Sequence, residues 1–94
     1  MSYKNDKGFN NGFIVKQLRQ YDQMNDFIAE VNLFMNESCV ETLQEHVETI
    51  RLYKKLCNKW TINEKASMIE KLENLKEILF DRIEEIRPIT AAEF

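Results

Sequence analysis

Glycine and proline are scarce in this sequence: two glycines and one proline occur in 94 residues. Tight turns between β-strands depend heavily on these two residues, so the chain has little turn chemistry available for a sheet. Glutamate, lysine, leucine and isoleucine are abundant instead, and these residues favour long helices. The composition therefore predicts an all-α protein.

Cysteine is also scarce, and no apolar run approaches the roughly 20 residues that a membrane-spanning helix needs. The two cysteines, Cys39 and Cys57, fall in one predicted helix, where they would lie about 27 Å apart, too far for a disulfide within the chain. Residues 1–8 carry charges but no apolar segment follows them, so we expect no signal peptide. Together these features predict reduced thiols, no membrane contact and a cytoplasmic location.

Apolar residues recur at helical spacing in three stretches, which predict antiparallel helices over about 13–35, 39–60 and 62–87. The joints between them are short, as in a helical bundle. Residues 1–11 are polar and predict a flexible N-terminal arm or a turn, and residues 88–94 predict a short C-terminal tail. The whole chain, 1–94, therefore reads as one helical-bundle domain.

Sequence signals for helix ends support these boundaries. Ser38 with Glu41, and Thr61 with Glu64, each have the spacing of a capping box, in which two side chains satisfy two backbone N–H groups at a helix start. Pro88 is expected to stop the third helix, because proline lacks the N–H donor that a helix interior needs.

The apolar faces are wider than one monomeric bundle requires. In the third predicted helix the apolar sector spans roughly 200°, whereas a surface helix needs an apolar stripe of only about 100° or a little more. We therefore expect a homo-oligomer. The apolar residues that a monomeric core does not need are the candidates for partner binding: Phe34, Leu52, Leu56, Ile78 and Phe80.

Charges are strongly segregated, although the net charge is only −3. Residues 20–50 contain seven acidic residues and no lysine or arginine. Residues 51–65 reverse the sign, with five basic residues against Glu64 alone. The helix macrodipole favours acids in a first turn and bases in a last turn, which explains Glu41 but not mid-helix acids such as Glu45.

The basic segment also contains aromatic residues, which allows a second interpretation. Basic side chains can hold a phosphate and aromatic rings can stack on a base. The candidate anion- or nucleotide-binding residues are Arg51, Tyr53, Lys54, Lys55, Lys59 and Trp60. For Tyr53 and Trp60, packing in the core or in an interface is the favoured interpretation. Duplex nucleic acid is a poor candidate partner, because the patch is short and the chain is acidic overall.

No catalytic motif is present: the sequence has no Gly-rich phosphate loop, no metalloprotease motif and no nucleophile elbow. His46 is the single histidine, and its spacing from Cys39 and Cys57 is too wide for one metal ion. We expect no catalytic residue, no metal, no cofactor and no enzymatic activity.

These features favour a small helical adaptor or inhibitor of a larger protein, and the Asn-, Lys- and Ile-rich composition fits the AT-rich genome of a phage. The alternative is an oligomeric module that sequesters a small anion such as a cyclic nucleotide.

Overall fold

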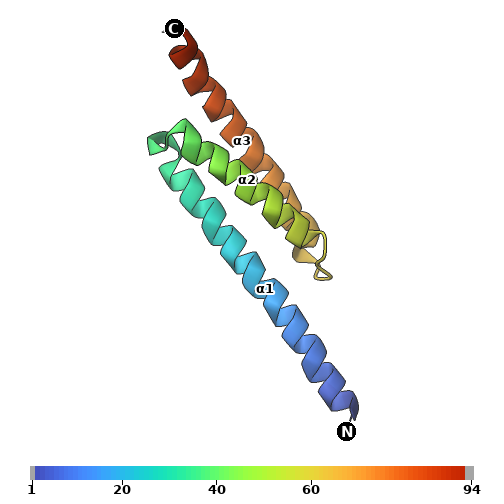
Figure 1. Ribbon diagram of the computed structural model, residues 1–94. Coiled ribbons are helices and arrows are strands. Elements are labelled where there is room, and N and C mark those ends of the chain that lie inside the picture. Colours follow the sequence, from blue (N-terminus) through green and yellow to red (C-terminus); the bar gives the residue numbers. More distant parts are fainter. Residues whose placement is uncertain (1, 93–94) are drawn as a thin grey trace.

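In the computed structural model the chain is all α-helical and forms an elongated three-helix arrangement, described for the backbone of residues 2–92 and the side chains of residues 12–86. Helix α1 spans Ser2–Phe34, a 3₁₀ turn (η1) covers Met35–Glu37, α2 spans Val40–Cys57 and α3 spans Glu64–Ala92. Figure 1 shows each helix folding back on the one before it. The prediction of an all-α chain with three long antiparallel helices is confirmed.

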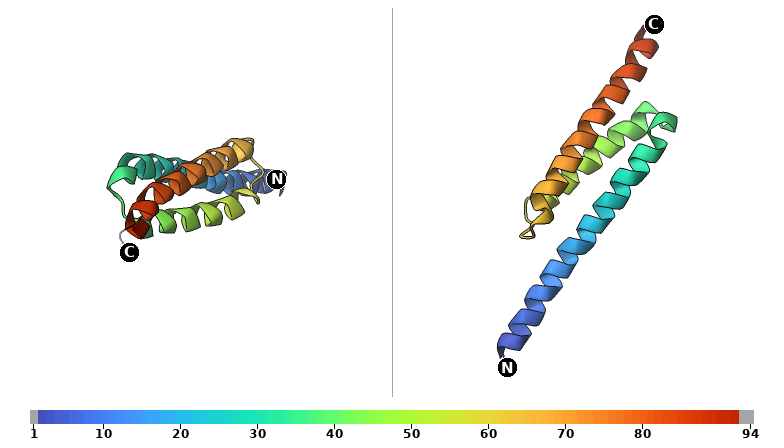
Figure 2. Two further views of the ribbon diagram at one scale, coloured as in Figure 1. Left: turned by 90° about the horizontal axis from the view of Figure 1, so that it is seen from above. Right: turned by 180° about the vertical axis from the view of Figure 1, so that it is seen from behind.

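The three helices differ greatly in length. They contain 33, 18 and 29 residues, which correspond to about 50, 27 and 44 Å of helix. All three helices therefore pack side by side only over the length of α2. The N-terminal end of α1 and the C-terminal end of α3 project past it in opposite directions (Figure 2). The radius of gyration, 17.7 Å, exceeds the roughly 12 Å expected for a compact domain of this length.

The core lies between α2 and α3 and is closed on one side by α1. On each helix, apolar residues that are three or four positions apart point inward, as expected for amphipathic helices. The core residues of α3 are almost fully buried along most of the length that α3 shares with α2. The core consists of Met24, Val31, Met35, Leu43, Val47, Ile50, Cys57, Trp60, Met68, Leu72, Leu75, Leu79 and Ile83.

Both predicted capping boxes are wrong. The Ser38 hydroxyl donates to the Phe34 carbonyl oxygen at 2.8 Å, which closes the preceding turn, and Cys39 is the N-cap residue of α2. The Thr61 N–H donates to the Gln17 Oε1 atom at 2.8 Å, and α3 begins only at Glu64. At the start of α2 the N-cap position belongs to Cys39 and not to Ser38, and at the start of α3 the Thr61 N–H that the box requires is bonded to Gln17.

The outer helix boundaries also differ from the sequence prediction. Helix α1 includes residues 2–11, where an arm or turn was expected. Extending a formed helix adds one hydrogen bond per residue, and a single glycine such as Gly12 costs only about 1 kcal/mol. Pro88 lies inside α3 rather than ending it. A proline removes one N–H donor, and so close to the end of the helix the loss affects a single turn.

Gln17 is the buried polar residue that ties α1 to the α2–α3 joint. Its Oε1 atom accepts from the N–H groups of Thr61 at 2.8 Å and Ile62 at 3.3 Å, and its Nε2 atom donates to the Thr61 hydroxyl at 3.3 Å. One helical turn away, the Trp60 Nε1–H donates to the Gln20 Oε1 atom at 2.8 Å. These bonds satisfy backbone groups that precede α3 and fix how far α1 extends past the joint.

We expect Gln17→Ala to lower the free energy of unfolding by about 1–3 kcal/mol, because two N–H groups at the joint lose their acceptor in a partly buried site. The matched control is Gln23→Ala, an exposed glutamine of the same helix, which should stay within about 0.5 kcal/mol of the parent chain. Urea unfolding followed by circular dichroism measures both. Equal stabilities would contradict the role assigned to Gln17.

Neighbouring positions on α3 test the packing. Leu79 is fully buried, whereas Ile78 is 46% exposed. Leu79→Ala should therefore destabilise the chain by about 2–5 kcal/mol, through lost burial and the cavity left behind. Ile78→Ala should change the stability by less than about 1 kcal/mol. The same urea experiment separates them, and a larger loss for Ile78→Ala would show that α3 is rotated from the orientation described.

Candidate docking surfaces

The five apolar residues predicted to bind a partner are all exposed, but they do not form one patch. Their exposed fractions run from 37% for Leu56 to 61% for Leu52. Phe80, Leu56, Leu52 and Phe34 each line a different surface hollow, and Ile78 lines none of these four. The structure thus confirms that these side chains lie outside the core, and their role in binding stays a prediction.

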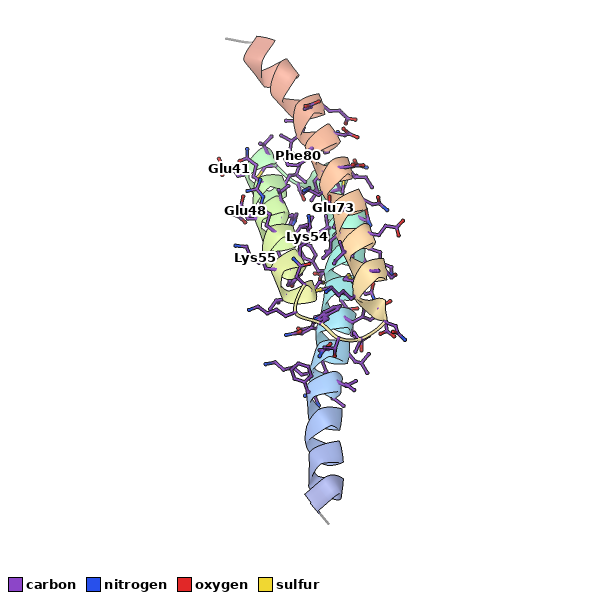
Figure 3. All side chains as sticks on the ribbon, turned by 90° about the vertical axis from the view of Figure 1, so that its right-hand side faces the viewer. Glu41, Glu48, Lys54, Lys55, Glu73 and Phe80 are labelled. Carbon is purple, nitrogen blue, oxygen red and sulfur yellow. The ribbon has the colours of Figure 1, made fainter. Side chains whose placement is uncertain are left out.

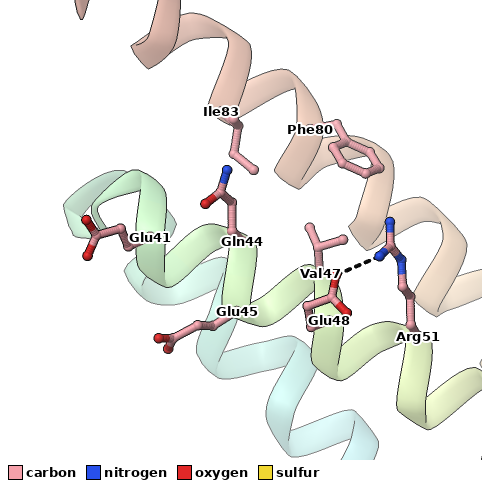
Figure 4. A pocket seen from close by; sticks show the side chains of 8 residues that line it. All are labelled: Glu41, Gln44, Glu45, Val47, Glu48, Arg51, Phe80 and Ile83. Carbon is pink, nitrogen blue, oxygen red and sulfur yellow. Dashed lines mark hydrogen bonds and ion pairs between the residues drawn. The ribbon is translucent and has the colours of Figure 1, made fainter.

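The largest of these hollows is an open groove of about 630 Å³ between α2 and α3. Val47, Phe80 and Ile83 supply its apolar surface. Gln44, Arg51 and three glutamates on α2, namely Glu41, Glu45 and Glu48, supply its polar wall. Figure 4 shows Phe80 projecting from α3 toward the ion pair between Arg51 and Glu48, whose closest atoms are 2.6 Å apart. An apolar surface beside an acidic wall suits a ligand that is both apolar and basic.

The basic–aromatic segment proposed for nucleotide binding is partly engaged in the fold. Trp60 is buried, and its indole N–H is bonded to Gln20. The ring of Tyr53 packs edge-on against Phe27, with ring centroids 5.2 Å apart. The buried ring of Trp60 therefore presents no open face for stacking against a base, and the ring of Tyr53 is already engaged by Phe27.

Lys54 is likewise committed to the contact between α2 and α3. Its Nζ atom forms an ion pair with the carboxylate of Glu73, which also pairs with Lys76 at 3.5 Å. Desolvation by burial, followed by the positive charge of Lys76, lowers the pKa of Lys54. Figure 3 shows Lys54 directed toward Glu73 and Lys55 directed away from it. Of the predicted anion-binding set, Arg51, Lys55 and Lys59 remain exposed, and Arg51 is paired with Glu48.

A second apolar surface, at the projecting end of α1, was not identified from the sequence. Four apolar side chains are 40–50% exposed in consecutive turns: Phe13, Ile14, Val15 and Leu18. Lys16 and Arg19 are exposed among them. Residues 12–20 contain no acidic residue. The signal that could have revealed this surface is the difference in helix length, because α1 continues beyond the point where α2 ends.

The two thiols lie in contrasting surroundings. Cys39 is exposed at the start of α2, and a hydrogen bond with the Thr42 hydroxyl is the main cause that lowers its pKa. Cys57 is buried against Met24, and this burial raises its pKa.

Across the described residues, no group of three histidine, cysteine, aspartate or glutamate side chains is arranged to hold a metal ion. Over the same residues, no helix combines the length and apolar character that crossing a bilayer requires.

No protein-family model, no curated protein and no solved structure matches this chain.

Alkylation at mildly alkaline pH should separate the two thiols. Cys39 should react readily, because its lowered pKa leaves more thiolate at a given pH. As the pH rises, the alkylation rate of Cys39 should reach its plateau at a lower pH than the rate of a cysteine whose pKa is not shifted. Cys57 should react only after unfolding, since it is fully buried. Mass spectrometry of the iodoacetamide-treated chain, with Cys39→Ser as control, measures this, and rapid double labelling of the folded chain would contradict the packing around Cys57.

Proposed function

We propose that this chain is a small, non-enzymatic helical binding protein that acts as an adaptor or inhibitor of a larger protein. The observation that carries the proposal is the projecting end of α1, where Phe13, Ile14, Val15 and Leu18 are exposed together. A helix that extends beyond its bundle has no packed neighbour to stabilise it, and short unsupported helices are marginal in water. Docking on another protein supplies the missing contacts.

Recognition of a helix by a groove fits this geometry. In that mode an amphipathic helix inserts side chains at spacings of three and four into an apolar groove. Ile14 and Leu18 have such a spacing, and both are about 40% exposed. Lys16 and Arg19 flank them. The partner surface that complements this end is therefore an apolar groove with acidic residues along its rim.

Nucleotide sequestration has weaker support than protein binding. Trp60 and Lys54, two of the residues on which that function depends, are engaged inside the fold by Gln20 and Glu73. The apolar residues of the α1 end, by contrast, are 40–50% exposed.

The test places a photoreactive amino acid at position 14 or 18 and irradiates the chain in cells that make it naturally. We expect a covalent adduct with one protein, whose crosslinked peptide lies in a groove bearing acidic residues. Positions 29 and 33 are the matched controls, because both are exposed on the same helix and should give no such adduct.

A substitution pair completes the test. Ile14→Glu with Leu18→Glu should abolish capture of the crosslinked protein, because the change removes apolar contacts and cancels the local positive charge of Lys16 and Arg19. Ala29→Glu with Leu33→Glu places the same charges at the same spacing elsewhere on α1 and should leave capture unchanged. Capture that survives the first pair, or adducts that form equally at all four positions, would show that this end does not dock.

A further inference from the structure

One exposed row of residues along α2, extended by Lys59 just past its last residue Cys57, has the spacing of a coiled-coil contact. Positions 41, 45, 48, 52, 55 and 59 alternate spacings of four and three, which is the heptad pattern. The burial of α2 places them on its outer face, since Leu43, Val47 and Ile50 lie on the opposite side in the core. All six are exposed: Glu41, Glu45, Glu48, Leu52, Lys55 and Lys59. We call this row the α2 seam.

The order of charges along the α2 seam is polarised. Its first three residues are glutamates, its centre is Leu52 at 61% exposure, and its last two are lysines. Among the described side chains, an ion pair is formed from the seam by Glu48 alone, with Arg51. Figure 3 shows Glu41, Glu48 and Lys55 on the outer side of α2, and Glu41 and Glu48 also form part of the wall of the groove between α2 and α3.

The seam is complementary to itself in an antiparallel arrangement. When a second α2 is laid antiparallel with the twofold axis at position 50, Glu41 faces Lys59 of the other copy and Glu45 faces Lys55. Glu48, already neutralised by Arg51, then faces Leu52. Each contact occurs twice, because a twofold interface uses the same surface on both chains. A parallel pairing instead sets glutamate against glutamate and lysine against lysine.

We propose that two copies of this chain associate through the α2 seam as an antiparallel dimer. The second copy covers Leu52 and lies beside the groove that contains Phe80, which is 42% exposed. The macrodipole of α2 accounts for Glu41 in its first turn and Lys55 in its last turn. It does not account for Glu45 or the exposed Leu52, whereas the dimer pairs Glu45 with Lys55 and covers Leu52. The interface is independent of the α1 end assigned to the protein partner.

Charge reversal at one contact provides the test. Glu45→Lys and Lys55→Glu each place two like-charged pairs in a dimer of identical chains. Each variant alone should raise the dimer dissociation constant by about tenfold or more. An equimolar mixture of the two should restore dimerisation, because every pair between the unlike chains is again of opposite charge. Sedimentation velocity measures the association, and the wild-type dimer should weaken as salt rises.

Two controls make the result specific. A single chain carrying both Glu45→Lys and Lys55→Glu should dimerise like the wild type, since the reversed pairs still match. Glu70→Lys applies the same charge change as Glu45→Lys at an exposed position outside the seam and should not alter association.

The proposal is overturned if the wild-type chain is monomeric at its highest soluble concentration, if the single reversals have no effect, or if the mixture fails to recover. Native mass spectrometry of the mixture, with the two variants distinguished by mass, should show the mixed dimer as the main species.

Discussion

The difference in length between α2 and its neighbours is the constraint on which the rest of the structure depends. α2 has 18 residues, against 33 in α1 and 29 in α3. The chain can therefore bury apolar side chains on three sides only along about 27 Å of its length. Beyond that segment, α1 and α3 lack a full set of neighbours, and apolar residues such as Phe13 and Leu18 are left exposed.

The joint between α2 and α3 determines where this shared segment ends. Gln17 accepts hydrogen bonds from the backbone of the joint, and Gln20 accepts one from Trp60. These contacts fix the axial position of α1 relative to α2 and α3. As a result, the apolar residues at positions 13–18 lie at the outer edge of the joint, and the acidic half of α2 lies at the opposite end of the molecule (Figure 1). The segregation of charge along the sequence thus becomes segregation along the long axis.

The core and the order of the helices could be predicted from the sequence, because apolar periodicity reports directly on which face of a helix is buried. Exposure of Leu52 and Phe80 followed from the same pattern. The helix ends could not be predicted, since the hydroxyl of Ser38 and the N–H of Thr61 have partners at Phe34 and Gln17 rather than in their own capping motifs. The pairing of Lys54 with Glu73 and the burial of Trp60 depend on contacts between residues distant in the sequence, which a local motif does not contain.

A distance between two copies of the chain measures whether a second copy covers the outer face of α2, as proposed. Cys39 is exposed and Cys57 is buried, so the native chain accepts a spin label at Cys39 without substitution. In the antiparallel dimer centred on position 50, the two labelled sites lie on opposite sides of the twofold axis, at a separation of about 35 Å. Pulsed electron–electron double resonance should show that distance, and it should disappear on dilution. A separation of roughly 10–15 Å, as a parallel pair of helices requires, or no dipolar coupling at high concentration would contradict the account.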